Sequence, residues 1–328
     1  MQQLFLTDPL SRLRPAKDSS VALMQAARTA GSQVWWAEPL HLQALDGDIT
    51  VLAQPLELAA MDHTPQGWQA PDPWYRQGAP EQRSLKGFQV VWMRRDPPVD
   101  DGYTFAAGLL AQAERRGVRV INRPASLLIW NEKLSALQFP QLMAPTTVAA
   151  DCTSLLAFIH QHQDVVLKPL AGKGGQGVVR ASSAMAGLKA LLELVTAQQQ
   201  LPVLAQAFLP DVVEGDKRIL LVNGEPVGAI NRRPQRGEFR SNLAVGGTPE
   251  ACDLSARDHT ICRALAEPLR RAGLAFVGID VIGPWLSEIN VTSPTGLREL
   301  EWLGGVPAAD VVMERVMNLA RFEGRQEK

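Results

Sequence analysis

Residues that usually build metal centres and nucleophilic active sites are scarce in this sequence. It contains three cysteines, Cys152, Cys252 and Cys262, and five histidines in 328 residues. Three cysteines at irregular spacing fit neither a disulfide framework nor a zinc site, and they indicate a reducing compartment. The histidines lack the spacing of metal ligands, and no Ser/His/Asp or Cys/His arrangement can be argued. We therefore assign no function to the histidines.

Long apolar runs and an excess of one charge are also absent. The formal net charge is −1, and no run of like charges exceeds a few residues. Neither nucleic acid nor an anionic membrane is therefore expected as a partner. No segment approaches the length of a bilayer-spanning helix, and the N-terminus lacks a basic segment followed by an apolar one. We expect a cytoplasmic protein.

The chain does contain enough residues for more than one globular core. Hydrophobic residues make up 46% and charged residues 20% of the 328 residues, and this length suggests two or three domains. Strands alternate with helices in the first third, which favours an α/β domain with a mainly parallel sheet. We predict an N-terminal substrate-side domain (1–122), a central domain with a glycine-rich loop (123–205) and a C-terminal domain (206–328).

Apolar periodicity and turn residues predict the elements of each domain. The first domain is expected to contain strands at 3–6, 34–36, 87–93 and 118–121 and helices at about 21–28 and 103–116. Residues 50–86 are rich in Pro, Gln and Asp, so we interpret them as loop and short pieces. The second domain is expected to contain helices near 153–162 and 184–199 and strands at 164–168, 177–180 and 203–206. The third opens with a hairpin at Asn223-Gly224, followed by a helix near 255–271.

The run from Phe276 to Thr295 is the most informative segment. It is typical of two apolar strands joined by a Gly283-Pro284 turn. Glu288 and Asn290 are two residues apart, so both project from one face of an extended strand, and the turn folds Asp280 towards that face. Two carboxylates and one amide oxygen suit a hard cation such as Mg²⁺. A hairpin with polar residues on its solvent side would show the same pattern.

A glycine-rich loop is the second informative segment. Gly172, Gly174, Gly175 and Gly177 fall within six residues, a density unsuited to a helix or a strand interior. Their bare N–H groups can close over a polyphosphate, although the spacings of the P-loop and of the Rossmann fingerprint are absent. A flexible connection between two strands is the alternative. Lys168, in the apolar strand before the loop, favours the phosphate site, because a buried lysine requires an anionic partner.

Further basic residues admit two interpretations each. Lys133 lies at a predicted helix start and has the default explanation of a surface lysine. Arg218 follows Asp216 ahead of a strand, where it can form a solvated ion pair or stabilise charge on a transferring phosphoryl group or an oxyanion. Between residues 232 and 247, basic residues alternate with glycines. That pattern fits a mobile loop closing on an anionic ligand, or an exposed linker.

Taken in order, these segments resemble the prokaryotic glutathione synthetases of the ATP-grasp superfamily, over nearly the whole chain. The matching segments are Met93-Arg-Arg-Asp-Pro-Pro-Val-Asp100, Ile121-Asn-Arg-Pro124, Asn131-Glu-Lys-Leu134, Val166-Leu-Lys-Pro-Leu170, Gly215-Asp-Lys-Arg218, Arg240-Ser-Asn-Leu-Ala-Val-Gly-Gly247 and Ser287-Glu-Ile-Asn-Val-Thr-Ser-Pro-Thr295. The resemblance implies an α/β protein with an ATP-grasp fold behind an N-terminal open, mainly parallel α/β domain. It also implies a homotetramer.

The resemblance implies ATP-dependent joining of γ-glutamylcysteine to glycine, which yields glutathione, ADP and phosphate through an acylphosphate. ATP with Mg²⁺ (or Mn²⁺) would lie between the central and C-terminal domains under the glycine loop as a lid. The implied ATP contacts are Lys133, Lys168, Gly172, Gly174, Gly175, Gln206, Phe208, Leu209 and Asp216. The implied metal ligands are Asp280, Glu288 and Asn290, and the implied catalytic residues are Arg218, Arg232 and Arg240. The implied substrate contacts are Asp18, Ser19, Ser20, Arg94, Asn242, Thr292, Ser293, Pro294 and Thr295.

Four positions depart from the pattern of the family. Ala171 and Lys173 stand where an acidic and an apolar residue are common, Ala207 replaces a polar residue, and Gly296 replaces a larger one. These departures leave the acceptor less defined than the reaction class. Two alternatives follow, another ATP-grasp carboxylate–amine ligase and a nucleotide-binding regulatory protein without catalysis. Retention of the lysines, Arg218 and the metal ligands argues against the second.

Overall fold

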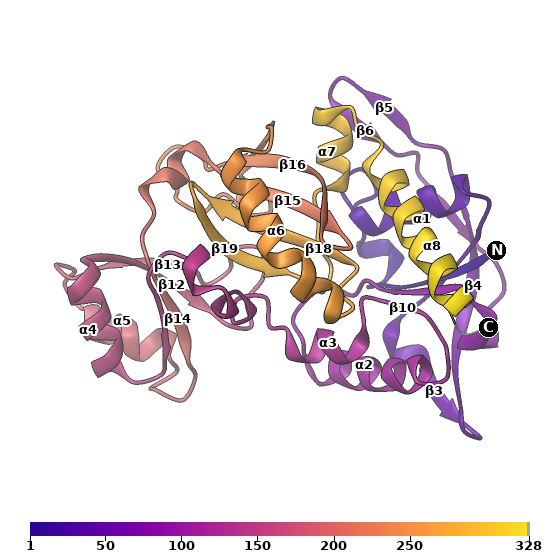
Figure 1. Ribbon diagram of the computed structural model, residues 1–328, viewed down its shortest axis with the longest axis horizontal. Helices are drawn as coiled ribbons and strands as arrows, with labels where there is room; N and C mark the ends of the chain where they lie inside the picture. The colour runs from indigo at the N-terminus through magenta and orange to yellow at the C-terminus, as the bar shows by residue number, and fades with distance from the viewer. Residues whose placement is uncertain (327–328) are drawn as a thin grey trace.

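The computed structural model describes residues 1–326, and in this part of the chain three sheets of four or more strands follow one another (Figure 1). The first sheet has a parallel core in the order β10-β9-β1-β2. Its elements are β1 (Gln2–Leu6), β2 (Gln33–Ala37), β9 (Val90–Met93) and β10 (Val120–Ile121), with helices α1 (Ser19–Thr29), α2 (Asp101–Glu114) and α3 (Pro124–Ile129). The alternation of strands and helices predicted this parallel core correctly.

The first sheet continues into an antiparallel part that the sequence did not predict. The added strands are β3 (Leu42–Leu45), β4 (Asp48–Leu58), β7 (Tyr75–Gln77) and β8 (Glu81–Ser84), beside a separate hairpin of β5 (Asp62–Thr64) and β6 (Gly67–Gln69). The interpretation of residues 50–86 as loop and short pieces is wrong for β4, an 11-residue strand. Its apolar alternation is interrupted by Gln54 and Pro55, and pairing with β2, where Pro55 lies opposite Trp35, supports the strand instead.

The second sheet is small, antiparallel and covered by two helices. Its strands are β11 (Thr146–Ala149), β14 (Val203–Ala207), β12 (Asp164–Pro169) and β13 (Val179–Ser182), in that order, and its helices are α4 (Cys152–His162) and α5 (Leu188–Val195). Leu155, Ile159 and Leu192 are fully buried against the sheet. Helix α5 is shorter than the predicted 184–199, because it begins after Gly187 at φ 76° and is followed by three residues with positive φ.

The third sheet is antiparallel and carries the hairpin that the sequence singled out. Its order is β17 (Thr248–Ala251), β16 (Glu225–Arg233), β15 (Asp216–Val222), β18 (Phe276–Ile282) and β19 (Trp285–Asn290), and α6 (Ala256–Arg271) covers it. Asn223 and Gly224, at φ 51° and 78°, form the two-residue turn between β15 and β16. The predicted turn at Gly283-Pro284 is also confirmed, since Ile282 pairs with Trp285.

The last helices return to the first sheet. Helix α7 (Leu297–Gly304) leads into α8 (Ala308–Gln326), which lies beside α1 with the two chain ends on the same side of the molecule (Figure 1). Val312 and Val316 of α8 are fully buried in one cluster with Phe5 and Leu23. Helix α8 thus completes the packing of the N-terminal domain. The domain boundaries at residues 122 and 205 stay predictions.

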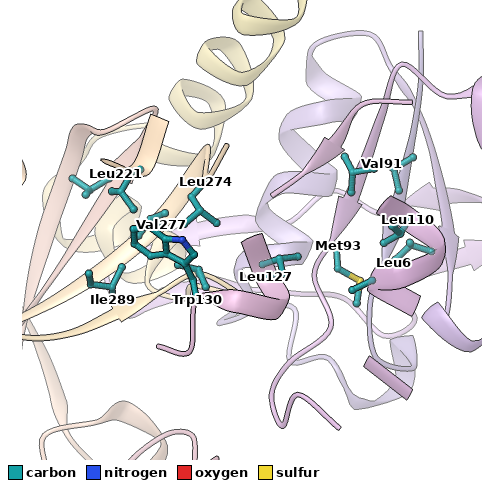
Figure 2. Packing of buried hydrophobic residues seen from close by; sticks show 14 of the residues in the cluster. Leu6, Val91, Met93, Leu110, Leu127, Trp130, Leu221, Leu274, Val277 and Ile289 are labelled. Carbon is teal, nitrogen blue, oxygen red and sulfur yellow. The ribbon is translucent and has the colours of Figure 1, made fainter. Parts of the chain in front are cut away.

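A continuous apolar cluster joins the first and third sheets (Figure 2). Leu6 and Val91 belong to its part in the first sheet, and Val277 and Ile289 to its part in the third. Trp130, which follows α3, lies against the third sheet in Figure 2. The first and third sheets are therefore held together by burial of apolar surface. Among residues 1–326, no helix is long and apolar enough to cross a membrane.

Candidate active site

A cavity of about 760 Å³ lies between the second and third sheets. Strands β12 and β14, the glycine loop, and strands β18 and β19 supply its walls. All the residues predicted to contact ATP line it, namely Lys133, Lys168, Gly172, Gly174, Gly175, Gln206, Phe208, Leu209 and Asp216. The structure therefore brings together segments that lie up to 83 positions apart in the sequence, from residue 133 to residue 216.

Lys168 extends from β12 across the floor of this cavity. Its Nζ atom donates to Oε1 of Gln206 and to Oγ of Ser287, both at 2.9 Å. Burial lowers the pKa of Lys168, and the negative charge of Glu288 opposes this effect. Both of its hydrogen-bond partners are neutral, so among the described residues the ammonium has no directly bonded counter-ion. An anion bound in the cavity would supply one.

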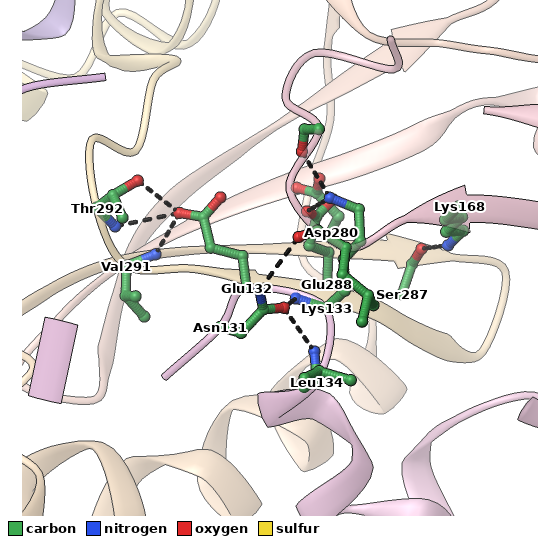
Figure 3. Close-up of polar contacts among 12 residues, drawn as sticks. Asn131, Glu132, Lys133, Leu134, Lys168, Asp280, Ser287, Glu288, Val291 and Thr292 are labelled. Atoms are coloured by element: carbon green, nitrogen blue, oxygen red, sulfur yellow. Dashed lines mark hydrogen bonds and ion pairs between the residues drawn. The ribbon is translucent and has the colours of Figure 1, made fainter. Parts of the chain in front are cut away.

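Lys133 reaches the same cavity from a turn, not from a helix start as predicted. The turn lies between α3 and a short 3₁₀ helix (Ser135–Gln138), and Oδ1 of Asn131 accepts from the N–H groups of Lys133 and Leu134. The Nζ atom donates to the Gly172 carbonyl at 2.7 Å and lies 3.3 Å from Oε1 of Glu288 (Figure 3). The side chain is only 7% exposed. Lys133 therefore fixes the glycine loop relative to β19.

Two arginines and two aspartates form a buried cluster beside the floor. Nη2 of Arg218 donates to Asp280 at 3.0 Å, and Nη2 of Arg232 lies 3.0 Å from Asp280 and 2.6 Å from Asp216. Burial alone would raise the pKa of Asp280, but the two guanidinium groups hold it well below its usual range. Burial raises the pKa of Asp216. Burial alone would lower the pKa of Arg232, yet the aspartates raise it. Arg232 therefore stays cationic, and the ion pairs fix the orientation of both guanidinium groups.

Glu288 and Asn290 lie on β19, as the two-residue spacing predicted. Asp280 is the cross-strand partner of Glu288 across the β18–β19 ladder, and Gly278 is the partner of Asn290. Asp280 and Glu288 line the first cavity, and Glu288 and Asn290 line the second cavity described below. Glu288 therefore stands where the two cavities meet.

The glycine loop covers the first cavity and contacts both neighbouring domains. Gly174, Gly175 and Gly177 all have positive φ. A Cβ atom on Gly175 would lie 2.6 Å from Oδ1 of Asn242, so only glycine allows this approach. Arg240 donates to the Gly175 carbonyl at 3.4 Å, and Lys173 lies 3.0 Å from Asp96 of the first domain. The loop is therefore held in a closed position over the cavity.

A second cavity, of about 920 Å³, adjoins the first. The two share Gly174, Gln176, Asn242 and Glu288 as lining residues. The second cavity also contains predicted catalytic and substrate residues, namely Arg218, Arg232, Thr292, Ser293 and Thr295. Arg240 lines the first cavity instead. One cavity with two lysines thus opens beside another that is lined by arginines, hydroxyl groups and an amide.

Five predicted substrate residues support the second cavity from behind and do not line it. Nε of Arg94 donates to Oγ of Ser20 at 3.1 Å, and Nη2 donates to the carbonyl of Pro294 at 2.9 Å. Oγ of Ser19 accepts from the N–H of Leu297 at 3.2 Å. Asp18 caps α1 by accepting from two backbone N–H groups, and burial raises its pKa. These bonds tie the polar tail after β19 to the first sheet.

Family models match both halves of this arrangement. The N-terminal domain of prokaryotic glutathione synthetase matches residues 1–127, and the ATP-grasp domain of prokaryotic glutathione synthetase matches residues 132–305. The chain belongs to the prokaryotic glutathione synthetase family. The resemblance that the motifs indicated is therefore confirmed.

Individual relatives and solved structures agree with the family. The glutathione synthetase of Parasynechococcus marenigrum (strain WH8102) is 57% identical over 319 residues, which are 97% of this chain and 100% of the relative. The glutathione synthetase of Nitrosomonas europaea (strain ATCC 19718) is 41% identical over 323 residues, 98% of this chain and 99% of the relative. The crystal structure of D-cycloserine synthetase DcsG has a TM-score of 0.62 at 16% identity, with 96% of this chain and 99% of that chain covered. That low identity shows a shared fold alone, and the family identifies the fold as ATP-grasp.

Glutathione synthetases of the ATP-grasp type use ATP with a divalent metal ion, and the residues here fit such an ion. Asp280, Glu288 and Asn290 offer hard oxygen donors. Each carboxylate oxygen has two lone pairs, so Asp280 can bind the arginines and a cation together. The buried Nδ2 of Asn290 has no hydrogen-bond partner among the described residues; as an N–H donor it suits a phosphate oxygen, and only Oδ1 of the same amide could bind the cation. The described part of the chain has no cluster of three His, Cys, Asp or Glu suited to a metal, so the set depends on the amide and on phosphate oxygens.

Sequence reasoning missed three polar residues at the site. Oε1 of Glu132 accepts three hydrogen bonds from the segment after β19, Ser287 binds Lys168, and Ser241 donates to Asp216 at 3.0 Å. Each lies within one residue of a predicted site residue. Glu132 belongs to the motif Asn131-Glu-Lys-Leu134, but only its neighbour Lys133 was predicted to have a functional role. The two-residue spacing along β19 singled out Glu288 and Asn290. Ser287 lies outside that spacing, yet its Oγ accepts a hydrogen bond from Nζ of Lys168.

Proposed function

We propose that this protein uses ATP to join γ-glutamylcysteine to glycine, with glutathione, ADP and phosphate as products and an acylphosphate as the intermediate. One observation carries the proposal. A cavity with two lysines under a glycine loop meets, at Glu288, a second cavity lined by two buried arginines. A reaction that first phosphorylates a carboxylate and then replaces the phosphate by an amine needs this adjacency, because the phosphoryl donor and the acceptor must meet.

The first cavity would bind ATP. Lys133 and Lys168 carry the charges that triphosphate oxygens require, and the N–H groups of the glycine loop would close over them. Gln206, Phe208 and Leu209 at the end of β14 would hold the adenine. The Arg180 guanidinium lies 3.8 Å from the centre of the Phe208 ring, which keeps this aromatic side chain in place.

A divalent cation, which we propose to be Mg²⁺ with Mn²⁺ as a substitute, would be held by Asp280, Glu288 and Asn290. When bound, it would neutralise charge on the phosphate groups. The described residues contribute the remaining positive charge. Lys133 lies beside Glu288, so its ammonium group would add positive charge next to the proposed cation site.

The second cavity would hold the dipeptide and glycine. The cysteinyl carboxylate of the dipeptide would receive the phosphoryl group, and the glycine amine would then attack the acylphosphate. Arg218 and Arg232 would stabilise the oxyanion of the tetrahedral intermediate, because their orientation is already fixed by Asp280 and Asp216. Arg240 and Asn242, which contact the glycine loop, would help to exclude water that hydrolyses the acylphosphate.

The N-terminal residues would serve the dipeptide indirectly. Arg94 holds the Pro294 carbonyl and Ser19 holds the N–H of Leu297. These bonds would position Thr292, Ser293 and Thr295 as contacts of the dipeptide. Asp18 would act by capping the helix that carries Ser19 and Ser20.

A coupled assay tests this function. Purified protein receives ATP, Mg²⁺, γ-glutamylcysteine and glycine, and phosphate and glutathione are both measured. We expect equal amounts of the two products and no phosphate release when either acceptor is left out. Phosphate release that ignores both acceptors, or none with all components present, would contradict the proposal. We also propose a cytoplasmic homotetramer, as in the family, and light scattering after gel filtration measures the assembly.

A further inference from the structure

Glu132 has one carboxylate oxygen fully engaged and the other open. Oε1 accepts from the N–H groups of Val291 and Thr292 at 3.0 and 3.1 Å and from Oγ1 of Thr292 at 2.7 Å. Figure 3 shows these three bonds converging on one oxygen while the second oxygen points away from them. Within the described part of the chain, no hydrogen bond reaches Oε2. The carboxylate is therefore fixed in orientation with one acceptor available.

Within the described residues, the charge of Glu132 also has no compensating cation. No lysine or arginine among the described residues forms an ion pair with it, although its close sequence neighbour Lys133 is paired with Glu288. Burial raises the pKa of Glu132, and the like charge of Glu288 raises it further, while the hydrogen bonds to Oε1 oppose both effects. A largely buried carboxylate without a cation is unfavourable unless a ligand supplies one.

The second cavity is where such a ligand would bind. Glu132 lines it together with Arg218, Asn290 and Thr292. Glu132 also borders a smaller cavity of about 660 Å³, but much of that wall is apolar, with Leu127, Trp130 and Leu170. Of these two cavities in the described part of the chain, the second also contains Arg218 and Arg232, so a positively charged group bound to Glu132 there would share the cavity with the proposed oxyanion site.

We propose that Oε2 of Glu132 binds the amino group of the acceptor amino acid in the second cavity. The inference rests on the proposed function and names the residue that recognises its amine substrate. Glu132 is a binding residue in this account: its open oxygen holds the ammonium group, and the three bonds to Oε1 fix the direction in which that oxygen points. Its carboxylate discriminates an amine from a neutral hydroxyl compound.

The Glu132→Gln variant tests this. Glutamine keeps a carbonyl oxygen for Val291 and Thr292 but replaces the open oxygen by an uncharged NH₂ group. We expect the KM for glycine to rise about 10- to 100-fold, the scale of one lost hydrogen bond to a charged group. The KM values for ATP and γ-glutamylcysteine should stay within about twofold, since neither uses Oε2. Glu132→Asp, which keeps the charge, should recover part of the affinity for glycine.

Hydroxylamine, used as the acceptor in place of glycine, distinguishes recognition of a charged amine by Glu132 from a purely structural role of this residue. This neutral amine needs no anionic partner, so hydroxamate formation from γ-glutamylcysteine and ATP should be equal in wild type and Glu132→Gln. If ATP, hydroxylamine and glycine are all impaired equally, Glu132 only positions the segment after β19 and the inference is overturned. An unchanged KM for glycine overturns it as well.

Direct titration of glycine distinguishes this inference from the proposed function. Calorimetry with a non-hydrolysable ATP analogue, Mg²⁺ and γ-glutamylcysteine measures binding without turnover. Wild type should bind glycine at least about tenfold more tightly than Glu132→Gln. Equal affinities, or no binding of glycine by wild type, overturn the role of Glu132. A wild type that binds glycine through Glu132 but forms no glutathione contradicts the proposed function alone.

Discussion

The Nζ atom of Lys133 lies 3.3 Å from Oε1 of Glu288, across the line where the two cavities meet. The same ammonium group donates to the Gly172 carbonyl at 2.7 Å. One ion pair therefore links the glycine loop, the floor of the first cavity and the entrance to the second. The negative charge of Glu288 would therefore bind the proposed cation, and it also holds Lys133 in place.

Loss of that charge should abolish most turnover. Glu288→Gln keeps the shape of the side chain but removes its charge from the proposed cation site and from Lys133. We expect kcat to fall by about 10²- to 10³-fold, the scale seen when one preorganised electrostatic group is removed. Glu225→Gln, on an exposed carboxylate at the start of β16, is the control and should keep full activity. Unchanged turnover of Glu288→Gln at low Mg²⁺ would refute the metal assignment.

The ion pair of Arg218 and Asp280 should contribute strongly to stability. Arg218→Ala leaves the buried Asp280 with Arg232 alone, so the free energy of unfolding should fall by about 3–5 kcal/mol. Urea denaturation followed by tryptophan fluorescence measures the loss. In the double variant Arg218→Ala/Asp280→Asn, the loss should be smaller than the sum of the two single losses, because no unpaired charge remains. Additive losses would show that the two side chains do not interact.

The close approach of the glycine loop to Asn242 can be tested with two matched substitutions. Gly175 and Gly187 have similar φ angles, 80° and 76°, so alanine meets similar backbone strain at both. A Cβ atom collides with Asn242 at position 175 and meets nothing within 4 Å at position 187. Steady-state kinetics should show a KM for ATP raised about 10- to 100-fold in Gly175→Ala. Gly187→Ala should keep the wild-type KM, and equal values for both variants would argue against a lid.

Lys168 should take up a proton when ATP binds. Burial lowers its pKa, so the folded state binds this proton less readily than the unfolded chain and gains stability as the pH rises from the folded pKa towards the unfolded one. A phosphate group beside the ammonium would raise the pKa again. Calorimetry at alkaline pH, in buffers of different ionisation enthalpy, should detect uptake of up to about one proton. Lys168→Met should lose this uptake, whereas Lys189→Met, at an exposed position of α5, should keep it.

The sequence predicted the two hairpins that carry the candidate site better than it predicted the antiparallel strands of the first sheet. Spacing along β19 placed Glu288 and Asn290, and the turn signals at Asn223-Gly224 and Gly283-Pro284 determined both hairpins of the third sheet. These signals are local, because a turn and a two-residue period both depend on residues that are adjacent or nearly adjacent in the sequence. Strand β4 carries no such signal: its pairing with β2 is a tertiary contact, and Pro55 obscures its alternation.

The partners of the charged residues could not be derived from the sequence. Arg218 was proposed for phosphate or oxyanion chemistry, yet its nearest partner is Asp280, 62 positions away. Glu132 binds residues about 160 positions later in the chain. Such pairs depend on the register of β15 against β18 and on how the chain enters the second domain. Neither the register nor this path of the chain can be predicted from the residues of one segment alone.

Helix α8 has a consequence for how the protein is made. Gln3 on β1 contacts Met313 on α8, 310 residues later, so α8 can cover its part of the first sheet only after everything between them has been synthesised. The N-terminal domain, although translated first, reaches its final packing last. Until then Phe5 and Leu23 lack Val312 and Val316 as packing partners in their cluster.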